Sequence, residues 1–343
     1  AIFTSNLDEF FMIRVGSLTD LALMSEPPVD NKSGMDPLEQ LRAIFQAVRP
    51  LYAKRDLVVS AIEQELRAHE IASLDISELT REEYEFVKEY FNDIILPVLS
   101  PQIIDRHHPF PHLTNKALYV AALLKGEDGE DIFGMIPIPA SLPKVVYLRG
   151  PGVRYILTEK VVEEFARSVF TIYEMQAKSI LSVTRNADIS PNDEGYDDYL
   201  YYMKKILKKR ARLAPVRLEM KNGIGVEQHL TGYLCDKLGL GRDQVYLCDS
   251  PLVMGYVYSL AEKLPQAQKR VLCYPPFKPQ PAPEYKKGDS MIKSVLKRDC
   301  FLSYPYQSME PFLRLVKEAA ADPSVMSIKI TIYRLANKSR LVE

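Results

Sequence analysis

The chain has 343 residues, more than one hydrophobic core usually supports, so we expect two or three domains. Hydrophobic residues make up 47% and charged residues 26%, a balance that excludes a fibrous or mainly disordered chain. The 44 basic and 45 acidic residues leave a net charge of −1, so a polyanion site must be a local patch and DNA is not an expected partner. No apolar run approaches the roughly 18 residues of a membrane span, and we expect no transmembrane segment.

The cysteines give no sign of a metal site. Cys235, Cys248, Cys273 and Cys300 are scattered and show no C-x-x-C spacing, so neither structural zinc nor a redox motif is supported. The pattern is typical of reduced, mostly buried thiols, and we predict a cytoplasmic protein. Because the chain opens directly in a helical pattern and stops just after a strand pattern, we interpret it as a fragment of a longer protein.

The N-terminal segment is predicted to be helical. Ser5 or Asn6 is expected to cap a helix that begins just after them, because both side chains accept hydrogen bonds from a first helical turn. Residues 38–69 repeat apolar side chains at helical spacing and predict a long second helix, which Pro50 is expected to bend or interrupt. Together these patterns predict a helical domain over residues 1–70.

The middle of the chain alternates helical and strand patterns. Thr80 and Glu83 form a capping-box sequence before a helix that runs to about Asn92. Beyond it, short β-rich runs and helical patterns are separated by turn signals. We predict strands at 118–124, 132–138, 144–148, 180–184 and 216–219, and helices at 161–170, 196–210 and 226–238. This mixed order predicts an α+β middle domain over residues 71–289.

A proline-rich stretch marks the next boundary. Residues 273–287 hold five prolines, which is typical of a stiff linker. A helix is predicted at 309–321 and a strand at 324–333, in which isoleucines alternate with polar residues. Helix followed by strand is the entry to an α/β domain, so residues 290–343 are predicted to begin one. The chain as a whole is predicted to be an α+β multidomain protein.

Arg334 is the strongest candidate site residue from position alone. It follows the predicted strand at its carboxyl end, where ligands gather in open α/β sheets. Its planar guanidinium suits phosphate oxygens. The alternative is an arginine that pairs with a surface carboxylate.

Asn6 and Arg14 form a second candidate site near the amino end. The amide of Asn6 can donate to and accept from a nucleotide, and Arg14 can project towards a phosphate. The alternatives are a helix cap for Asn6 and a solvated or salt-bridged surface role for Arg14.

A basic stripe is the third candidate. Lys204, Lys205, Lys208 and Lys209 share one helical face and continue towards Arg212, so the stripe attracts polyphosphate or nucleic-acid backbones. The alternative is a solvated helix C-terminus favoured by the macrodipole.

Three histidines cluster around a rigid Pro109–Pro111 turn. His107, His108 and His112 resemble metal ligands at first sight, but no second group of ligands completes a shell. We predict a structural role for them. The sequence has no phosphate-binding P-loop.

Several motifs resemble those of the bacterial polyphosphate kinase family, in the family's order. They are residues 6–14 (NLDEFFMIR), 108–115 (HPFPHLTN), 184–189 (TRNADI, with Asn186 in place of an aspartate), 304–306 (YPY) and 328–334 (IKITIYR). The resemblance covers essentially the whole chain. It implies a helical N-terminal domain, an α+β head domain and the first helix and strand of a phospholipase-D-like α/β domain.

The resemblance also implies a reaction. The family transfers the terminal phosphate of ATP reversibly onto polyphosphate through a phosphohistidine, with Mg²⁺. By resemblance Asn6 contacts ATP, and Arg334 lies at the magnesium and phosphate site, where a guanidinium holds phosphate oxygens. The nucleophilic histidine lies beyond this chain, so the fragment alone is expected to be inactive.

The same resemblance implies partners and alternatives. ATP, ADP and polyphosphate are the expected ligands, the head domain is expected to mediate homo-oligomerisation, and a peripheral inner-membrane location is an alternative to a free cytoplasmic one. A different class stays open: a non-catalytic module that binds a polyanion through the stripe from Lys204 to Arg212. A phospholipase-D-like hydrolase is a third interpretation.

Overall fold

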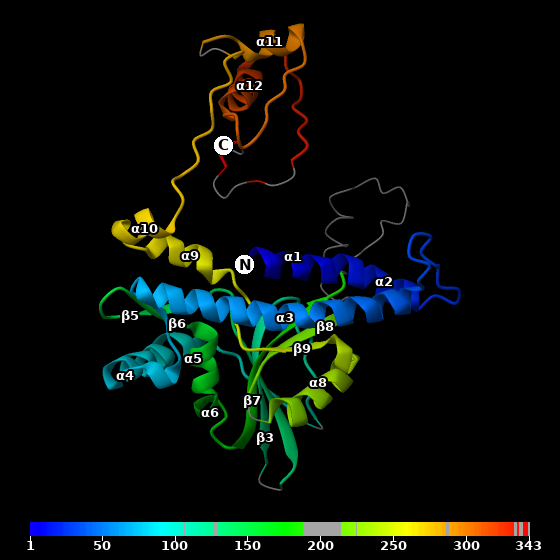
Figure 1. Ribbon diagram of the computed structural model, residues 1–343, viewed down its shortest axis with the longest axis vertical. Coiled ribbons are helices and arrows are strands. Elements are labelled where there is room, and N and C mark those ends of the chain that lie inside the picture. The colour runs from blue at the N-terminus through cyan, green and yellow to red at the C-terminus, as the bar shows by residue number, and fades with distance from the viewer. Residues whose placement is uncertain are drawn as a thin grey trace. The chain divides into compact units, whose positions relative to one another are not determined.

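The computed structural model describes residues 1–105, 107–126, 129–187, 214–223, 225–285, 288–332, 335 and 339–341 (Figure 1). The chain divides into two compact units, residues 1–269 and residues 270–343. Each unit is described by itself.

The chain begins with one extended helical segment. It consists of α1 (Ile2–Phe10), the π-helical turn η1 (Phe11–Val15) and α2 (Gly16–Ala22). The predicted cap is therefore wrong: the helix begins at Ile2, and Asn6 lies inside it. The reason is tertiary packing, which overrides the local capping preference. The buried residues follow helical spacing from the start of the chain; they are Thr4, Leu7, Phe11, Val15 and Leu18.

The long second helix is confirmed. α3 spans Pro37–Ala68, with Asp36 and Glu39 forming a reciprocal capping box at its start. The helix continues through Pro50 without interruption. Figure 1 shows α1 and α2 running alongside α3. The capping box of Thr80 is also confirmed, and begins α4 (Arg81–Tyr90).

The first unit also contains two sheets. The larger has the strand order β2-β4-β3-β7-β8-β9 and is antiparallel except between β8 and β9; the smaller has the order β1-β6-β5. The strands are β1 (Ile71–Ser73), β2 (Gln102–Ile104), β3 (Leu118–Lys125), β4 (Asp131–Pro137), β5 (Val145–Leu148), β6 (Val153–Leu157), β7 (Glu174–Arg185), β8 (Pro215–Lys221) and β9 (Val245–Cys248). All five strands predicted for the middle domain are present in the structure.

The remaining helices of this unit are short. They are η2 (Ile76–Glu78), η3 (Phe91–Ile95), η4 (Leu96–Val98), α5 (Thr158–Glu164), α6 (Ala166–Val169), η5 (Val226–Leu230), α8 (Thr231–Leu238), η6 (Arg242–Gln244), α9 (Tyr256–Lys263) and α10 (Gln266–Leu272), whose last residues belong to the second unit. The helices predicted at 161–170 and 226–238 are confirmed as α5–α6 and η5–α8. The helix predicted at 196–210 lies outside the described residues.

Both faces of the larger sheet are buried. On β3, Val120, Ala122 and Leu124 join the core under α1, α3 and α5, whereas Tyr119, Ala121 and Leu123 join the core under α8. The alternation follows from the period of two in a strand. The N-terminal helices and the sheet therefore share one hydrophobic core.

The second unit is small. It contains α11 (Met291–Lys297) and α12 (Glu310–Ala321), which confirms the helix predicted at 309–321. Residues 324–332 do not form the predicted strand. Their alternation of isoleucines is a strand pattern, but strand formation also needs a neighbouring strand to bond the backbone, and these described residues pair with none.

Candidate functional site

A fully buried arginine joins the N-terminal helices to the sheet. Arg217 on β8 is 0% exposed. Its Nη2 donates to Asp8 on α1, its Nη1 donates to the hydroxyl of Tyr52 on α3 at 3.0 Å, and its Nε donates to Thr184 Oγ1 at 3.0 Å. Nη2 also lies 3.1 Å from Glu219 Oε2. Three elements distant in sequence are thus held by one guanidinium.

Aromatic rings and a second arginine surround this group. The guanidinium of Arg217 lies 4.7 Å from the ring centroid of Phe11, and that of Arg55 lies 4.6 Å from the ring centroid of Tyr52. Nη1 of Arg55 lies 3.5 Å from Glu219 Oε1. Burial and the charge of Glu219 raise the pKa of Tyr52 well above its ordinary value. Tyr52 therefore stays a neutral donor, and it donates to Glu219 at 2.7 Å.

Arg217 stays positively charged in this environment. Burial acts to lower the pKa of Arg217, but Glu219, Tyr52 and Asp8 raise it above its ordinary value. A buried charge is tolerated because carboxylates and hydrogen-bond acceptors surround it. We call the set Asp8, Tyr52, Thr184, Arg217 and Glu219 the junction network.

Three of the resembling motifs meet beside the junction network. The carbonyl of Met12 accepts from the backbone N–H of Ala187 at 2.8 Å. Nδ2 of Asn186 donates to Asp20 Oδ2 at 2.8 Å, and Nδ2 of Asn115 donates to the sulfur of Met12 at 3.7 Å. Segments near residues 12, 115 and 186 are therefore in direct contact, and these side chains serve the joint between helices and sheet.

Asn6 lies on the outer face of α1, opposite to the face that carries Asp8. Its side chain is exposed and makes no hydrogen bond with any described residue. Its neighbours on the exposed surface of the segment include apolar groups, since Phe10 is 38% and Ile13 is 41% exposed. The face thus offers an uncommitted amide beside apolar side chains and the exposed carboxylate of Glu9.

Arg14 is placed at the surface. Its Nη2 donates to Gln40 Oε1 on α3 at 2.7 Å. The remaining candidates, Lys204, Lys205, Lys208, Lys209 and Arg334, lie outside the described residues. The structure therefore places Asn6 and Arg14 on one helical segment and does not bring them into mutual contact.

The histidine turn has a local structural explanation. Asp105 Oδ1 accepts from the backbone N–H groups of His107 and His108 and lies 2.8 Å from His108 Nδ1. Within the described residues, no group of three or more His, Cys, Asp or Glu side chains is arranged to hold a metal ion. None of the described helices is long and apolar enough to cross a membrane.

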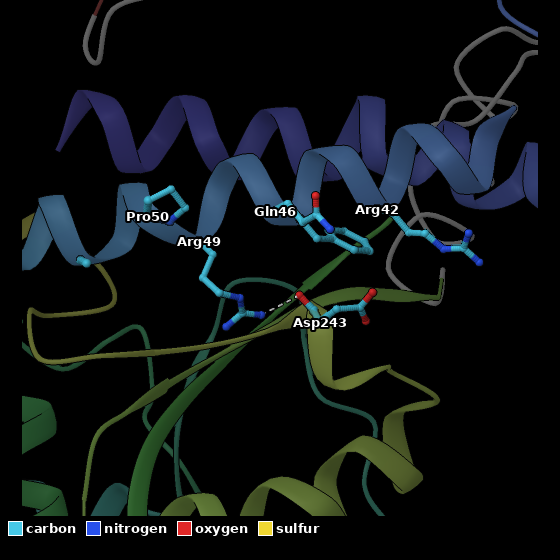
Figure 2. A pocket seen from close by; sticks show the side chains of 7 residues that line it. Arg42, Gln46, Arg49, Pro50 and Asp243 are labelled. Atoms are coloured by element: carbon cyan, nitrogen blue, oxygen red, sulfur yellow. Dashed lines mark hydrogen bonds between the residues drawn. The ribbon is translucent and has the colours of Figure 1, made fainter. Parts of the chain in front are cut away.

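A pocket of about 500 Å³ lies between α3 and η6 (Figure 2). Arg49 Nη2 donates to the carbonyl oxygens of Asp243 and Val245 at 3.1 and 3.3 Å. Figure 2 shows Arg49 directed at Asp243, whereas Arg42 extends along the helix. Arg49 thus bonds one carbonyl of η6 and one carbonyl of the edge strand β9. None of the predicted site residues lines this pocket.

Sequence reasoning missed the centre of the junction network. Arg217 and Glu219 alternate with the buried Val216, Leu218 and Met220 on β8. Such alternation predicts a solvated polar face, but here α1 and α3 cover it. The available signal was the opposite charge of two residues that are two apart on one strand face.

Three family models match this chain. They are the polyphosphate kinase N-terminal domain over residues 1–74, the polyphosphate kinase middle domain over 82–260, and the polyphosphate kinase C-terminal domain 1 over 290–343.

Curated relatives of this chain are also polyphosphate kinases. The polyphosphate kinase of Bacillus cereus is 34% identical over 351 residues, which cover 100% of this chain and 50% of the relative. The polyphosphate kinase of Exiguobacterium sibiricum is 33% identical over 346 residues, covering 100% of this chain and 48% of the relative. The chain thus spans about half the length of the curated relatives it matches.

The fold has a counterpart among solved structures. A crystal structure of polyphosphate kinase from Porphyromonas gingivalis matches 99% of this chain and 48% of its own, with a TM-score of 0.69 and 20% sequence identity. The fold and the junction network thus define an α+β protein in which N-terminal helices are locked onto a mixed sheet. With the family models and the curated relatives, the conclusion is specific: the chain belongs to the polyphosphate kinase family.

Proposed function

We propose that this chain forms the N-terminal and middle parts of an enzyme that transfers the terminal phosphate of ATP to polyphosphate, and that Asn6 contacts the nucleotide. Family membership supports the reaction class. One structural observation carries the residue assignment: the Asn6 amide is exposed and uncommitted among the described residues, on a helix whose other face is bonded to the sheet. Such an amide can recognise a base or ribose without first breaking an internal hydrogen bond.

The covalent chemistry is assigned to residues beyond this chain. We infer that the terminal phosphoryl group moves from ATP to a histidine nitrogen, that ADP leaves, and that the phosphoryl group then passes to a terminal oxygen of polyphosphate. Arg334 is proposed to hold phosphate oxygens as charge gathers there. The requirement for Mg²⁺ that the family resemblance implies remains a prediction.

The finer organisation is proposed from the sequence. We divide the chain into a helical domain over residues 1–70, a head domain over 71–289 and the start of a phospholipase-D-like domain over 290–343. Homo-oligomerisation through the head domain and a cytoplasmic location remain predictions. The alternative polyanion-binding function rests on the stripe from Lys204 to Arg212, which lies outside the described residues.

The nucleotide assignment is tested with Asn6→Ala in the complete protein. Loss of one or two neutral hydrogen bonds should raise the Michaelis constant for ATP roughly 3- to 10-fold. Ser5→Ala is the matched control, because Ser5 is an exposed neighbour on the same helix. An unchanged Michaelis constant and an unchanged ATP dissociation constant in Asn6→Ala would remove Asn6 from the site.

A further inference from the structure

We propose that Asp8 is a positioning residue for Asn6: by binding Arg217 it fixes the rotation of α1 and so holds the Asn6 amide towards the nucleotide. This inference rests on the proposed contact between Asn6 and ATP. Asp8 itself lies on the inner face, and it acts only through the orientation of the helix.

Helix geometry couples the two residues. Successive residues in an α-helix are ~100° apart, so Asn6 and Asp8 point in directions about 200° apart. Asp8 Oδ1 accepts from Arg217, and Asp8 Oδ2 lies 3.2 Å from Lys116 Nζ. Each oxygen of the Asp8 carboxylate therefore contacts a basic side chain outside α1, one on β8 and one just before β3. Any rotation of α1 that moves Asn6 must break at least one of these contacts.

Hydrophobic packing fixes the rotation of the segment firmly at Phe11, Val15 and Leu18, which are buried, but less firmly in its first turns. The inner face of α1 buries Thr4 and Leu7, but Ile2 and Phe3 are 70% and 41% exposed. Apolar side chains thus lie on both sides of the first turns, and a rotation confined to those turns would still bury apolar surface. A single buried polar interaction distinguishes such alternatives, because only one rotation satisfies it.

The position of the Arg217 guanidinium does not depend on Asp8. Arg217 lies on β8, which is bonded to β7 on one side and β9 on the other. Its guanidinium is also held by Tyr52, Thr184 and Glu219. The arginine therefore keeps its place when Asp8 is altered, and the first turns of α1 are the part that can shift.

The test is a double-mutant cycle in the complete enzyme, using Asp8→Asn, Asn6→Ala and the pair. Asp8→Asn should raise the Michaelis constant for ATP roughly 3- to 10-fold with kcat nearly unchanged, because it weakens binding in the ground state and the transition state alike. In the Asn6→Ala background, Asp8→Asn should add less than about 2-fold, since its effect passes through Asn6.

A matched control separates positioning from general destabilisation. Glu83→Gln weakens the pair with Arg154, whose Nε lies 2.9 Å from Glu83 Oε1. The Glu83 side chain is 11% exposed and the Asp8 side chain 15%, so the two changes remove similarly buried charges. Glu83→Gln should leave the Michaelis constant for ATP unchanged. Asp8→Glu, which keeps the charge but lengthens the side chain, gives a second variant should Asp8→Asn fold poorly, and we expect it to show the same dependence on Asn6.

The outcomes are distinguishable. If Asn6→Ala leaves ATP binding intact, the proposed nucleotide contact fails. If Asn6→Ala weakens ATP binding while the Asp8 variants leave it unchanged, the positioning role is overturned. If the effects of Asp8 and Asn6 multiply fully in the double variant, Asp8 acts independently of Asn6, and the inference is again overturned.

Discussion

Replacing Arg217 with methionine should be one of the most damaging single changes in this chain. Methionine fills similar space but removes the hydrogen bonds to Asp8, Tyr52 and Thr184. Removal of one partner from a buried ion pair typically costs about 3–5 kcal/mol, because a charge is left buried and unpaired. Here both carboxylates keep a second partner, since Asp8 lies near Lys116 and Glu219 accepts from Tyr52. We therefore expect a loss near the lower limit, about 3 kcal/mol.

The measurement is urea unfolding of the complete protein, followed by circular dichroism at pH 7. If the slope of the free energy is about 3 kcal/mol per molar urea, this loss lowers the midpoint of the transition that involves residues 1–269 by about 1 M. The loss should shrink when Glu219→Gln is added, because the second change removes one of the uncompensated charges. A loss below about 1 kcal/mol, or full additivity in the double variant, would refute the view that the junction network is electrostatically coupled.

Three further changes test other parts of the structure. Burial raises the pKa of Glu159 from 4.5 to about 7, so its protonated form stabilises the fold fully below pH 4.5 and that contribution disappears as the pH rises through 7; in urea titrations at pH 5 and 8, Glu159→Gln should raise stability at pH 8 by at most about 3 kcal/mol and little at pH 5. Gly16→Ala should lower the melting temperature although alanine favours helices, because its Cβ would lie 2.2 Å from Asn186 Oδ1; an increase would show that α2 can shift away. Glu318 accepts from the backbone N–H groups of Met291 and Ile292 at 3.0 and 3.1 Å, so Glu318→Gln should speed hydrogen exchange at the start of α11 roughly 10-fold, and unchanged exchange would contradict that capping role.

Local patterns predicted the elements whose stability is decided locally. The capping box of Thr80 begins α4, and the β-rich run at 118–124 forms β3. Two expectations failed where distant residues decide the outcome. Asn6 does not cap, because burial of Leu7 and its helical neighbours extends the helix to Ile2. Residues 324–332 carry a strand pattern, yet a strand also needs a pairing partner.

The junction network was beyond the reach of local patterns for a related reason. Arg217 contacts residues that lie 165 and 209 positions away, at Tyr52 and Asp8. Hydrophobic periodicity reports which face of an element is apolar, but it does not report what covers the polar face. On β8 the polar face is covered by helices that carry the complementary groups. The sequence therefore predicted the strand correctly but did not indicate what its polar side chains contact.

The motif at residues 6–14 illustrates how structure and function can share one short segment. Helical geometry turns Asp8, Phe11 and Met12 towards the sheet, where the carboxylate, the ring and the carbonyl are all engaged. The same geometry leaves Asn6 outside. Groups already bonded within the protein must break those bonds before they can bind a ligand, whereas an uncommitted amide need only exchange water. Within this segment Asn6 is therefore a better candidate than Asp8 for the proposed nucleotide contact, and Asp8 is proposed to act only through the orientation of the helix.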